Sequence, residues 1–288
     1  CDFMEQNRDQ PFFLYVAHHA THMGIQARPD MFEKFDEKGP AELHKNTRFA
    51  AMNAQMDDGV GLLLDKLKDL GLEENTLVVF TSDNGALPQS PPTPLRGFKG
   101  MYYEGGVRVP MIARWPGVVE AGSRCNTPVI NIDFYPTFLA LADTAGNDPA
   151  GNDPAATVPQ PLDGANLTPL LTGGVLDREA IFWHFPGYLN SPNPGSRDNV
   201  FRARPETTIR KGDWKLHLYH EEWLLDGGAE KIASNRCVEL YNLADDIAER
   251  HDLANDFPAK RDELLGDILA WHKQIAAPMP RPLADTGR

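Results

Sequence analysis

Cysteine is scarce in this sequence and long apolar runs are absent, and each shortage excludes a class of protein. Only three cysteines, Cys1, Cys125 and Cys237, occur among the 288 residues, far apart and odd in number. This spacing predicts neither a disulfide framework nor a cysteine metal site. No apolar run reaches the roughly 18 residues that a membrane-spanning helix requires, so no membrane span is expected.

Basic residues are outnumbered as well. The chain carries 28 Lys and Arg against 41 Asp and Glu, which gives a formal net charge of -13. A surface that neutralises nucleic-acid phosphates needs clustered basic residues, so no nucleic-acid partner is expected. The remaining composition, 41% hydrophobic and 24% charged, is typical of a globular chain with a full core.

The first half of the chain has the pattern of an α/β fold. Residues 11–17 form a continuous apolar run that predicts a buried parallel strand. Apolar residues recur at helical spacing over residues 47–70, and a second helix begins at Asp133. Between these helices, residues 76–82 and 107–115 predict two more strands.

Beyond about residue 173 the pattern changes to short strands separated by turns. The predicted strands are residues 180–185, two arms within 207–219 around a turn at 211–213, and residues 238–243. They predict a small antiparallel sheet with a helix over residues 259–275 on its face. We therefore expect two domains, residues 1–172 and 173–288, with a flexible Gly/Asn/Asp/Pro-rich insertion at 143–161.

Two oxygen-bearing side chains, Asp83 and Asn84, directly follow the predicted strand at residues 76–82. Open α/β sheets bind ligands at the carboxyl ends of their strands, so both side chains are candidate metal ligands. A carboxylate and a carboxamide oxygen suit Ca²⁺ or Mg²⁺, although either ion needs further ligands. The alternative is a local turn in which both side chains bond to nearby backbone before Gly85.

Two further groups carry candidate chemistry. His22 ends a histidine cluster that starts at His18, and an imidazole exchanges protons near neutral pH. Lys99 and Arg96 lie in a glycine-rich segment and concentrate positive charge in an acidic chain, as an anionic substrate requires. The alternatives are a solvated strand end for the histidines and solvated loop cations for the other two residues.

These segments, taken together, resemble one family over nearly the whole chain. The matching segments, in order, are residues 11–22, 56–61, 76–85, 96–110, 211–215 and 239–243. They look like the arylsulfatase-type sulfatases of the alkaline phosphatase superfamily. The resemblance implies a large mixed sheet flanked by helices, plus a smaller C-terminal antiparallel sheet with a helix.

The resemblance also implies roles for the candidate residues. Asp83 and Asn84 match half of the family's calcium site, and Asp83 also neighbours the nucleophile as its expected base. Lys99 matches the lysine that holds sulfate, and His22 matches the histidine that protonates the leaving alcohol. Ca²⁺ is thus the expected cofactor, with Mg²⁺ as the alternative.

A small anionic substrate, above all a sulfated carbohydrate, is the expected partner. The C-terminal region often borders the substrate pocket in carbohydrate sulfatases, which makes His184 a predicted substrate contact in addition to Arg96. The alternative functions are hydrolysis of phosphate or phosphonate esters, and binding without catalysis. The resemblance also implies a periplasmic or extracellular location, and the sequence indicates no oligomeric state.

One part of the family pattern is missing from this chain. Sulfatases carry an early Cys-x-Pro-Ser-Arg-like signature whose Cys or Ser becomes formylglycine, and none of the three cysteines lies in such a context. Thr21 and Phe98 also replace a frequent proline and a frequent glycine. We expect the chain to be the C-terminal portion of a sulfatase, with formylglycine only in the missing upstream part. Without that nucleophile and half of the calcium site, the isolated chain is expected to be inactive.

Overall fold

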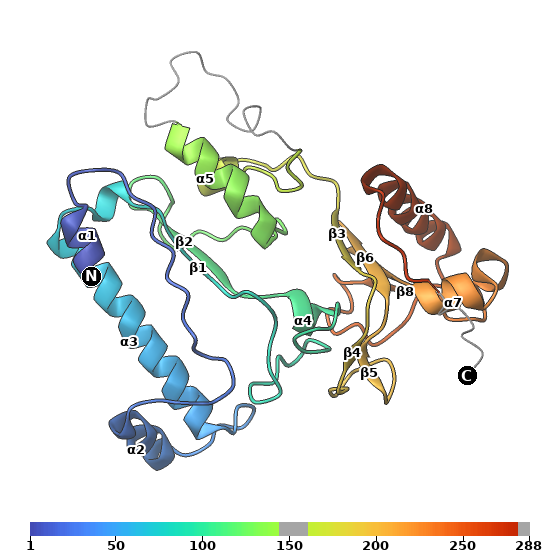
Figure 1. The fold of residues 1–288 in the computed structure, drawn as a ribbon, viewed down its shortest axis with the longest axis horizontal. Helices are drawn as coiled ribbons and strands as arrows, with labels where there is room; N and C mark the ends of the chain where they lie inside the picture. Colours follow the sequence, from blue (N-terminus) through green and yellow to red (C-terminus); the bar gives the residue numbers. More distant parts are fainter. Residues whose placement is uncertain (144–160, 282–288) are drawn as a thin grey trace. The chain divides into compact units, whose positions relative to one another are not determined.

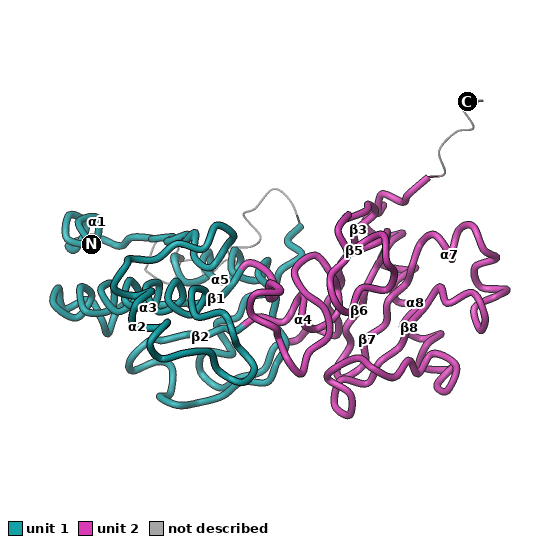
Figure 2. The backbone as a smooth tube through the Cα atoms, turned by 90° about the horizontal axis from the view of Figure 1, so that it is seen from below, with its two compact units in different colours: residues 1–82, 110–176 teal, residues 83–109, 177–288 magenta. Residues whose placement is uncertain are grey.

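The protein is represented by a computed structural model, which describes residues 1–143 and 161–281. It contains two compact units of mixed helix and strand (Figure 1, Figure 2). Unit 1 comprises Cys1–Ser82 and Pro110–Leu176, and unit 2 comprises Asp83–Val109 and Asp177–Arg288. The expected insertion at 143–161 lies almost wholly outside the described residues. No helix among the described residues is both long and apolar enough to cross a bilayer.

Unit 1 combines helices with one short pair of strands. Its helices are α1 (Asp2–Gln6), α2 (Pro29–Lys38), α3 (Thr47–Asp69), α5 (Phe134–Asp143) and α6 (Thr168–Leu171), with 3-10 turns at Glu73–Asn75 and Asn131–Asp133. Strands β1 (Val78–Thr81) and β2 (Met111–Arg114) pair antiparallel, with Val79 opposite Ala113. The helix expected over residues 47–70 and the helix start near Asp133 are confirmed.

Helix α3 forms where the sequence supplies a cap at each end. At its start the Asn46 side chain accepts a hydrogen bond from the Phe49 N–H at 3.0 Å. At its end Gly71 has a φ of 67°, and the Leu72 N–H returns to the Leu67 carbonyl at 2.9 Å. Helix α2 packs against it, and the Arg48 guanidinium of α3 lies 4.5 Å from the centre of the Phe32 ring of α2.

The predicted buried strand at residues 11–17 is wrong. The segment forms no strand, and Phe13 and Tyr15 are 67% and 79% exposed. A strand requires a hydrogen-bonded neighbour, and none of the described residues pairs with this segment. Strand β1 likewise has one described partner, the antiparallel β2, and is half-buried. The apolar run thus marked a β-prone segment without specifying a partner.

Unit 2 is organised around a four-stranded antiparallel sheet in the order β3-β6-β7-β8. Its strands are β3 (Ile181–Phe185), β6 (Glu206–Lys211), β7 (Trp214–Tyr219) and β8 (Val238–Asn242). The smaller elements are α4 (Glu104–Val107), α7 (His220–Leu225), a 3-10 turn at Gly228–Lys231, and the pair β4 (Leu189–Asn190) and β5 (Phe201–Ala203). The expected antiparallel sheet and its hairpin at residues 207–219 are confirmed.

The two faces of this sheet differ in chemistry. Successive strand residues point to opposite faces, so Leu216 and Leu218 face one side while Lys215 and His217 face the other. Helix α8 (Pro258–Ile275) packs on the apolar face, as expected for the terminal helix (Figure 1). Its residue Ile268 belongs to the same buried core as the two leucines. The charged face is covered by the glycine-rich segment described below.

Removing a buried side chain from α8 tests this packing. Ile268→Ala should lower the free energy of unfolding by about 2–5 kcal/mol, because it leaves a cavity in a closed core. Leu269→Ala alters the adjacent residue, which is 40% exposed, and should cost under about 1 kcal/mol.

Urea unfolding followed by tryptophan fluorescence measures both variants. The signal reports mainly on unit 2, which holds four of the five tryptophans: Trp183, Trp214, Trp223 and Trp271. Equal losses for the two variants would contradict the packing.

Candidate functional site

The glycine-rich segment expected to bind an anion, residues 96–106, belongs to unit 2 and is held by backbone hydrogen bonds. The Gly85 N–H donates to the Gly106 carbonyl at 2.9 Å, and the Ala86 N–H donates to the Gly105 carbonyl at 3.1 Å. The Lys99 N–H donates in turn to the Ala86 carbonyl at 2.8 Å. These bonds connect the predicted anion-binding lysine directly to the segment that carries the two predicted metal ligands.

Glycine is required where these backbone segments meet. A Cβ on Gly85 would overlap the Gly105 carbonyl, and a Cβ on Gly106 would overlap the Met101 carbonyl, each at well under 3.0 Å. No side chain fits at either position, because the obstructing atoms are backbone. The glycines therefore permit the close packing that places Lys99.

The predicted metal ligands and the predicted sulfate lysine differ in their contacts. Asp83 is exposed, and the Asn84 side-chain amide donates a hydrogen bond to Asp83 Oδ2. This contact brings the two oxygen-bearing groups together, and it also suits the local-turn alternative. The Lys99 ammonium, in contrast, forms no ion pair or hydrogen bond with any residue of 1–143 or 161–281.

Other predicted site residues lie elsewhere. His22 is exposed in unit 1, with its Nδ1 3.2 Å from the Met23 carbonyl oxygen, and its approach to the unit 2 residues stays a prediction. The Arg96 guanidinium lies 3.7 Å from the centre of the Tyr103 ring and donates to the Glu249 carbonyl at 3.0 Å. Arg96 thus holds the segment in place, and its contact with substrate also stays a prediction.

His184 lies on β3, and both of its ring nitrogens have partners. Its Nδ1 is 2.8 Å from Thr207 Oγ1, and its Nε2 is 2.7 Å from the Pro278 carbonyl oxygen. The predicted contact of this side chain with substrate remains untested.

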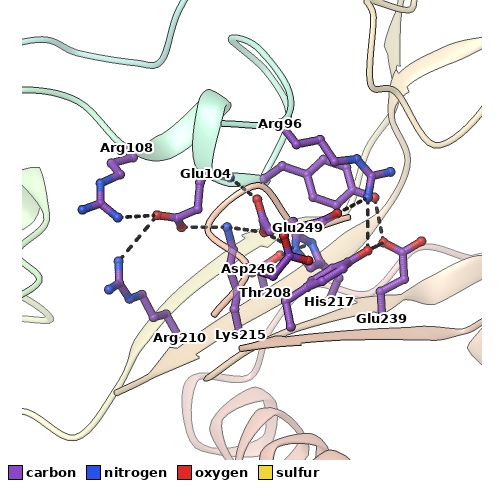
Figure 3. A network of polar contacts seen from close by, with 12 residues as sticks. Arg96, Glu104, Arg108, Thr208, Arg210, Lys215, His217, Glu239, Asp246 and Glu249 are labelled. Carbon is purple, nitrogen blue, oxygen red and sulfur yellow. Dashed lines mark hydrogen bonds and ion pairs between the residues drawn. The ribbon is translucent and has the colours of Figure 1, made fainter. Parts of the chain in front are cut away.

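A buried ion network anchors the glycine-rich segment to the sheet. Figure 3 shows its members Glu104, Lys215, Glu249 and His217, and Glu206 also belongs to it. The Lys215 Nζ lies 3.0 Å from Glu104 Oε1 and 3.0 Å from Glu249 Oε1, and all three side chains are at most 1% exposed. The backbone N–H of Glu104 also donates to Glu249 Oε2 at 2.5 Å. Helix α4 is therefore tied to the sheet through both its side chain and its backbone.

His217 extends this network along β7. Its Nδ1 lies 3.0 Å from Glu206 Oε2, and its Nε2 lies 3.4 Å from Glu249 Oε1. Burial alone would lower the pKa of His217, but the hydrogen bonds to the two glutamates overcome it and raise that pKa. Burial raises the pKa of Glu249, whereas the Lys215 charge and the His217 hydrogen bond outweigh it and lower that pKa.

A second buried group ties the same segment to β8. Three tyrosine hydroxyls donate to Glu239 Oε2, those of Tyr103 at 2.7 Å, Tyr219 at 3.0 Å and Tyr241 at 3.0 Å. Because Tyr103 directly precedes α4, the carboxylate of one strand holds the start of that helix. The segment bearing Lys99 is thus fastened to the sheet at two points.

Sequence reasoning missed the buried ion network as a unit. A signal was present, because Lys215 and His217 alternate with leucines in an apolar strand, where a charge requires a buried partner. The sequence did not identify the partner of Lys215, since 111 positions separate this residue from Glu104. Only the fold brings the two together.

Comparison with known proteins identifies the family. Residues 2–144 match the family described as Sulfatase, and residues 98–265 match the family described as N-sulphoglucosamine sulphohydrolase, C-terminal. A sulfatase of Formosa agariphila is 34% identical over 302 residues, which cover 97% of this chain and 48% of that protein. The chain therefore belongs to the sulfatase family, and the resemblance inferred from the sequence is confirmed.

Solved structures show the same relationship. The crystal structure of Ps i-CgsB in complex with k-i-k-neocarrahexaose has a TM-score of 0.69 and 28% identity, covering 94% of this chain and 52% of that chain. The structure of BT4656 in complex with its substrate D-glucosamine-2-N,6-O-disulfate has a TM-score of 0.58 and 27% identity. The match covers 83% of this chain and 42% of that chain. The chain spans about half the length of the curated relatives it matches.

The buried ion network predicts a large loss of stability when its cation is removed. Lys215→Met should lower the free energy of unfolding by about 3–5 kcal/mol, because Glu249 and Glu104 both lose a buried cation. Glu104 keeps its ion pairs with Arg108 and Arg210, so most of the loss should come from Glu249. Lys231→Met removes an exposed ion pair with Asp226, whose partners are 58% and 53% exposed, and should cost under about 1 kcal/mol. Urea unfolding measures both. Adding Glu249→Gln to Lys215→Met should restore part of the loss, and no recovery would argue against a charge-based cause.

The raised pKa of His217 predicts how stability depends on pH. A group with a higher pKa in the folded state stabilises fully below its unfolded pKa and loses that contribution as the pH rises through the folded value. The unfolding free energy of the wild type minus that of His217→Gln should therefore decrease between about pH 6 and pH 9.

Urea unfolding across that pH range measures the difference. His251→Gln, at an exposed histidine of the same unit, is the control and should change stability little at any pH. A His217 difference that grows with pH would show that the ring is not held as a cation.

Proposed function

We propose that the whole protein hydrolyses sulfate esters of carbohydrates. The observation that carries this proposal is the Lys99 ammonium, which has no partner among the described residues and is held beside the Asp83–Asn84 segment. A cation left unpaired in an acidic chain is suited to an anionic substrate. Membership of the sulfatase family supports the reaction, and the two carbohydrate-bound relatives support the class of substrate.

In this proposal the residues of the chain have separate roles. Asp83 and Asn84 offer the hard oxygen ligands that Ca²⁺ or Mg²⁺ prefers, and a bound cation would neutralise charge on the sulfuryl oxygens. Lys99 binds the sulfuryl group and the leaving oxygen, where charge develops in the transition state. His22 donates a proton to the departing alcohol. Asp83 is also the expected base for a formylglycine nucleophile of the whole protein, which we expect to be periplasmic or extracellular.

The buried ion network supports Lys99 without touching substrate. Lys215 and Glu249 hold α4, and the backbone of that region bonds to Arg96 and, through Ala86, to Lys99. A catalytic cation contributes most when its position is set before the substrate arrives, because little reorganisation is then needed. We therefore assign Lys215 as a positioning residue.

Substitution of the lysine tests the proposal in the whole protein. Lys99→Ala should lower kcat for sulfate release from a sulfated oligosaccharide by about 100–1000-fold, because it removes stabilisation of developing charge. Lys231→Ala, at an exposed lysine of the same unit, should leave kcat unchanged. Ion chromatography of released sulfate measures the rate, and circular dichroism checks that both variants are folded.

The choice of substrate separates the alternatives. Faster turnover of aryl phosphate than of aryl sulfate would favour a phosphate or phosphonate ester hydrolase. Binding of the sulfated oligosaccharide without release of sulfate would favour a non-catalytic protein. Unchanged kcat in Lys99→Ala would remove the observation on which the proposal rests.

A further inference from the structure

Three histidines from different elements meet around one hydroxyl group in unit 2. Thr207 Oγ1, on β6, lies 2.8 Å from His184 Nδ1, 3.0 Å from His220 Nε2 and 2.7 Å from His272 Nε2. The ring centres are 5.5, 5.2 and 5.6 Å apart, so the imidazoles form a nearly regular triangle. His184 lies on β3, His220 begins α7, and His272 lies in the last turn of α8.

Hydrogen-bond chemistry allows one consistent arrangement of protons in this cluster. The Pro278 carbonyl can only accept, so His184 Nε2, 2.7 Å away, carries a proton. In the neutral ring His184 Nδ1 therefore accepts from the Thr207 hydroxyl. The two lone pairs of that hydroxyl then accept from the Nε2–H groups of His220 and His272. One hydroxyl thus bonds to one nitrogen of each of three neutral rings.

Neutral imidazole is the form that binds metal ions. With the protons placed as above, all three rings are neutral and each directs one nitrogen at the same oxygen. His220 is fully buried, and its Nε2 faces the Thr207 hydroxyl at 3.0 Å.

We propose that His184, His220 and His272 bind a divalent transition-metal ion, with Zn²⁺ as the best fit, and that the ion fastens the end of α8 to the sheet. One nitrogen from each ring lies within 4.8 Å of the corresponding nitrogens of the other two. If the ion replaced the hydroxyl oxygen, each nitrogen would move inward by roughly 0.6–1.0 Å to reach a zinc–nitrogen distance of about 2.0–2.1 Å. Water would complete the coordination.

The ligand set distinguishes this site from the one that contains Asp83 and Asn84. Imidazole suits zinc, copper and nickel, whereas carboxylate and carboxamide oxygens suit calcium and magnesium. The histidine cluster offers nitrogen ligands and no carboxylate. Calcium in excess should therefore leave the bound transition metal in place.

Metal analysis of the whole protein tests the proposal. After treatment with a chelator and dialysis against Zn²⁺ in the presence of excess Ca²⁺, the wild type should retain one zinc ion per chain. Zinc at about 100 times its dissociation constant should raise Tm by a few degrees. Co²⁺ in place of Zn²⁺ should give the visible absorption of a histidine-bound ion.

Variants locate the ion. His272→Gln and His184→Gln, at the two partly exposed positions, should each weaken zinc binding at least about 10-fold and reduce the rise in Tm to about half or less. His251→Gln alters an exposed histidine outside the cluster and should bind zinc like the wild type.

Two results would overturn the proposal. One is a wild type that retains no zinc and gives no Co²⁺ absorption. The other is zinc binding that persists unchanged in both His272→Gln and His184→Gln, since the ion would then lie elsewhere in the protein. Neither result bears on sulfate-ester hydrolysis, because Lys99 and the Asp83–Asn84 pair are not part of this cluster.

Discussion

A lysine ammonium buried between two carboxylates is the constraint on which unit 2 depends. Lys215 has lost its hydration, and this loss is tolerable only if Glu104 and Glu249 both arrive within hydrogen-bond distance. Glu249 comes from the chain beyond β8, whereas Glu104 comes from the glycine-rich segment. The folded sheet and the correctly placed segment therefore stabilise each other, because each supplies a carboxylate that Lys215 requires.

The sheet can meet this constraint because one of its faces is apolar and the other carries charged side chains. On β7 the leucines face α8 and build an apolar core, while Lys215 and His217 face the segment that bears Lys99. Lys99 must remain available for an anion. The segment that bears it is supported by the buried ion network, in which Lys215 and His217 are paired with glutamates. The same alternation sends Thr207 of β6 toward the three histidines and its neighbour Thr208 toward His217.

Much of the fold could be predicted from the sequence, and the exceptions have physical causes. Helix α3 and the β6–β7 hairpin were predictable because caps, turn glycines and apolar period are local properties. The structure of residues 11–17 was not predictable, because an apolar run does not determine which strand, if any, it pairs with. Among the site residues, Asp83, Asn84 and Lys99 were found by motif, and the backbone bonds now connect their segments.

What the sequence by itself determined is the longer helices, the C-terminal hairpin, the family, and the residue types that carry the chemistry, since helices, turns and motifs depend on neighbours within a few positions. What only the tertiary structure decided is which distant groups share a buried space. The pairing of Lys215 with Glu104 and the meeting of His184, His220 and His272 span long stretches of chain. Such contacts arise from how strands and helices pack, and no local pattern encodes them.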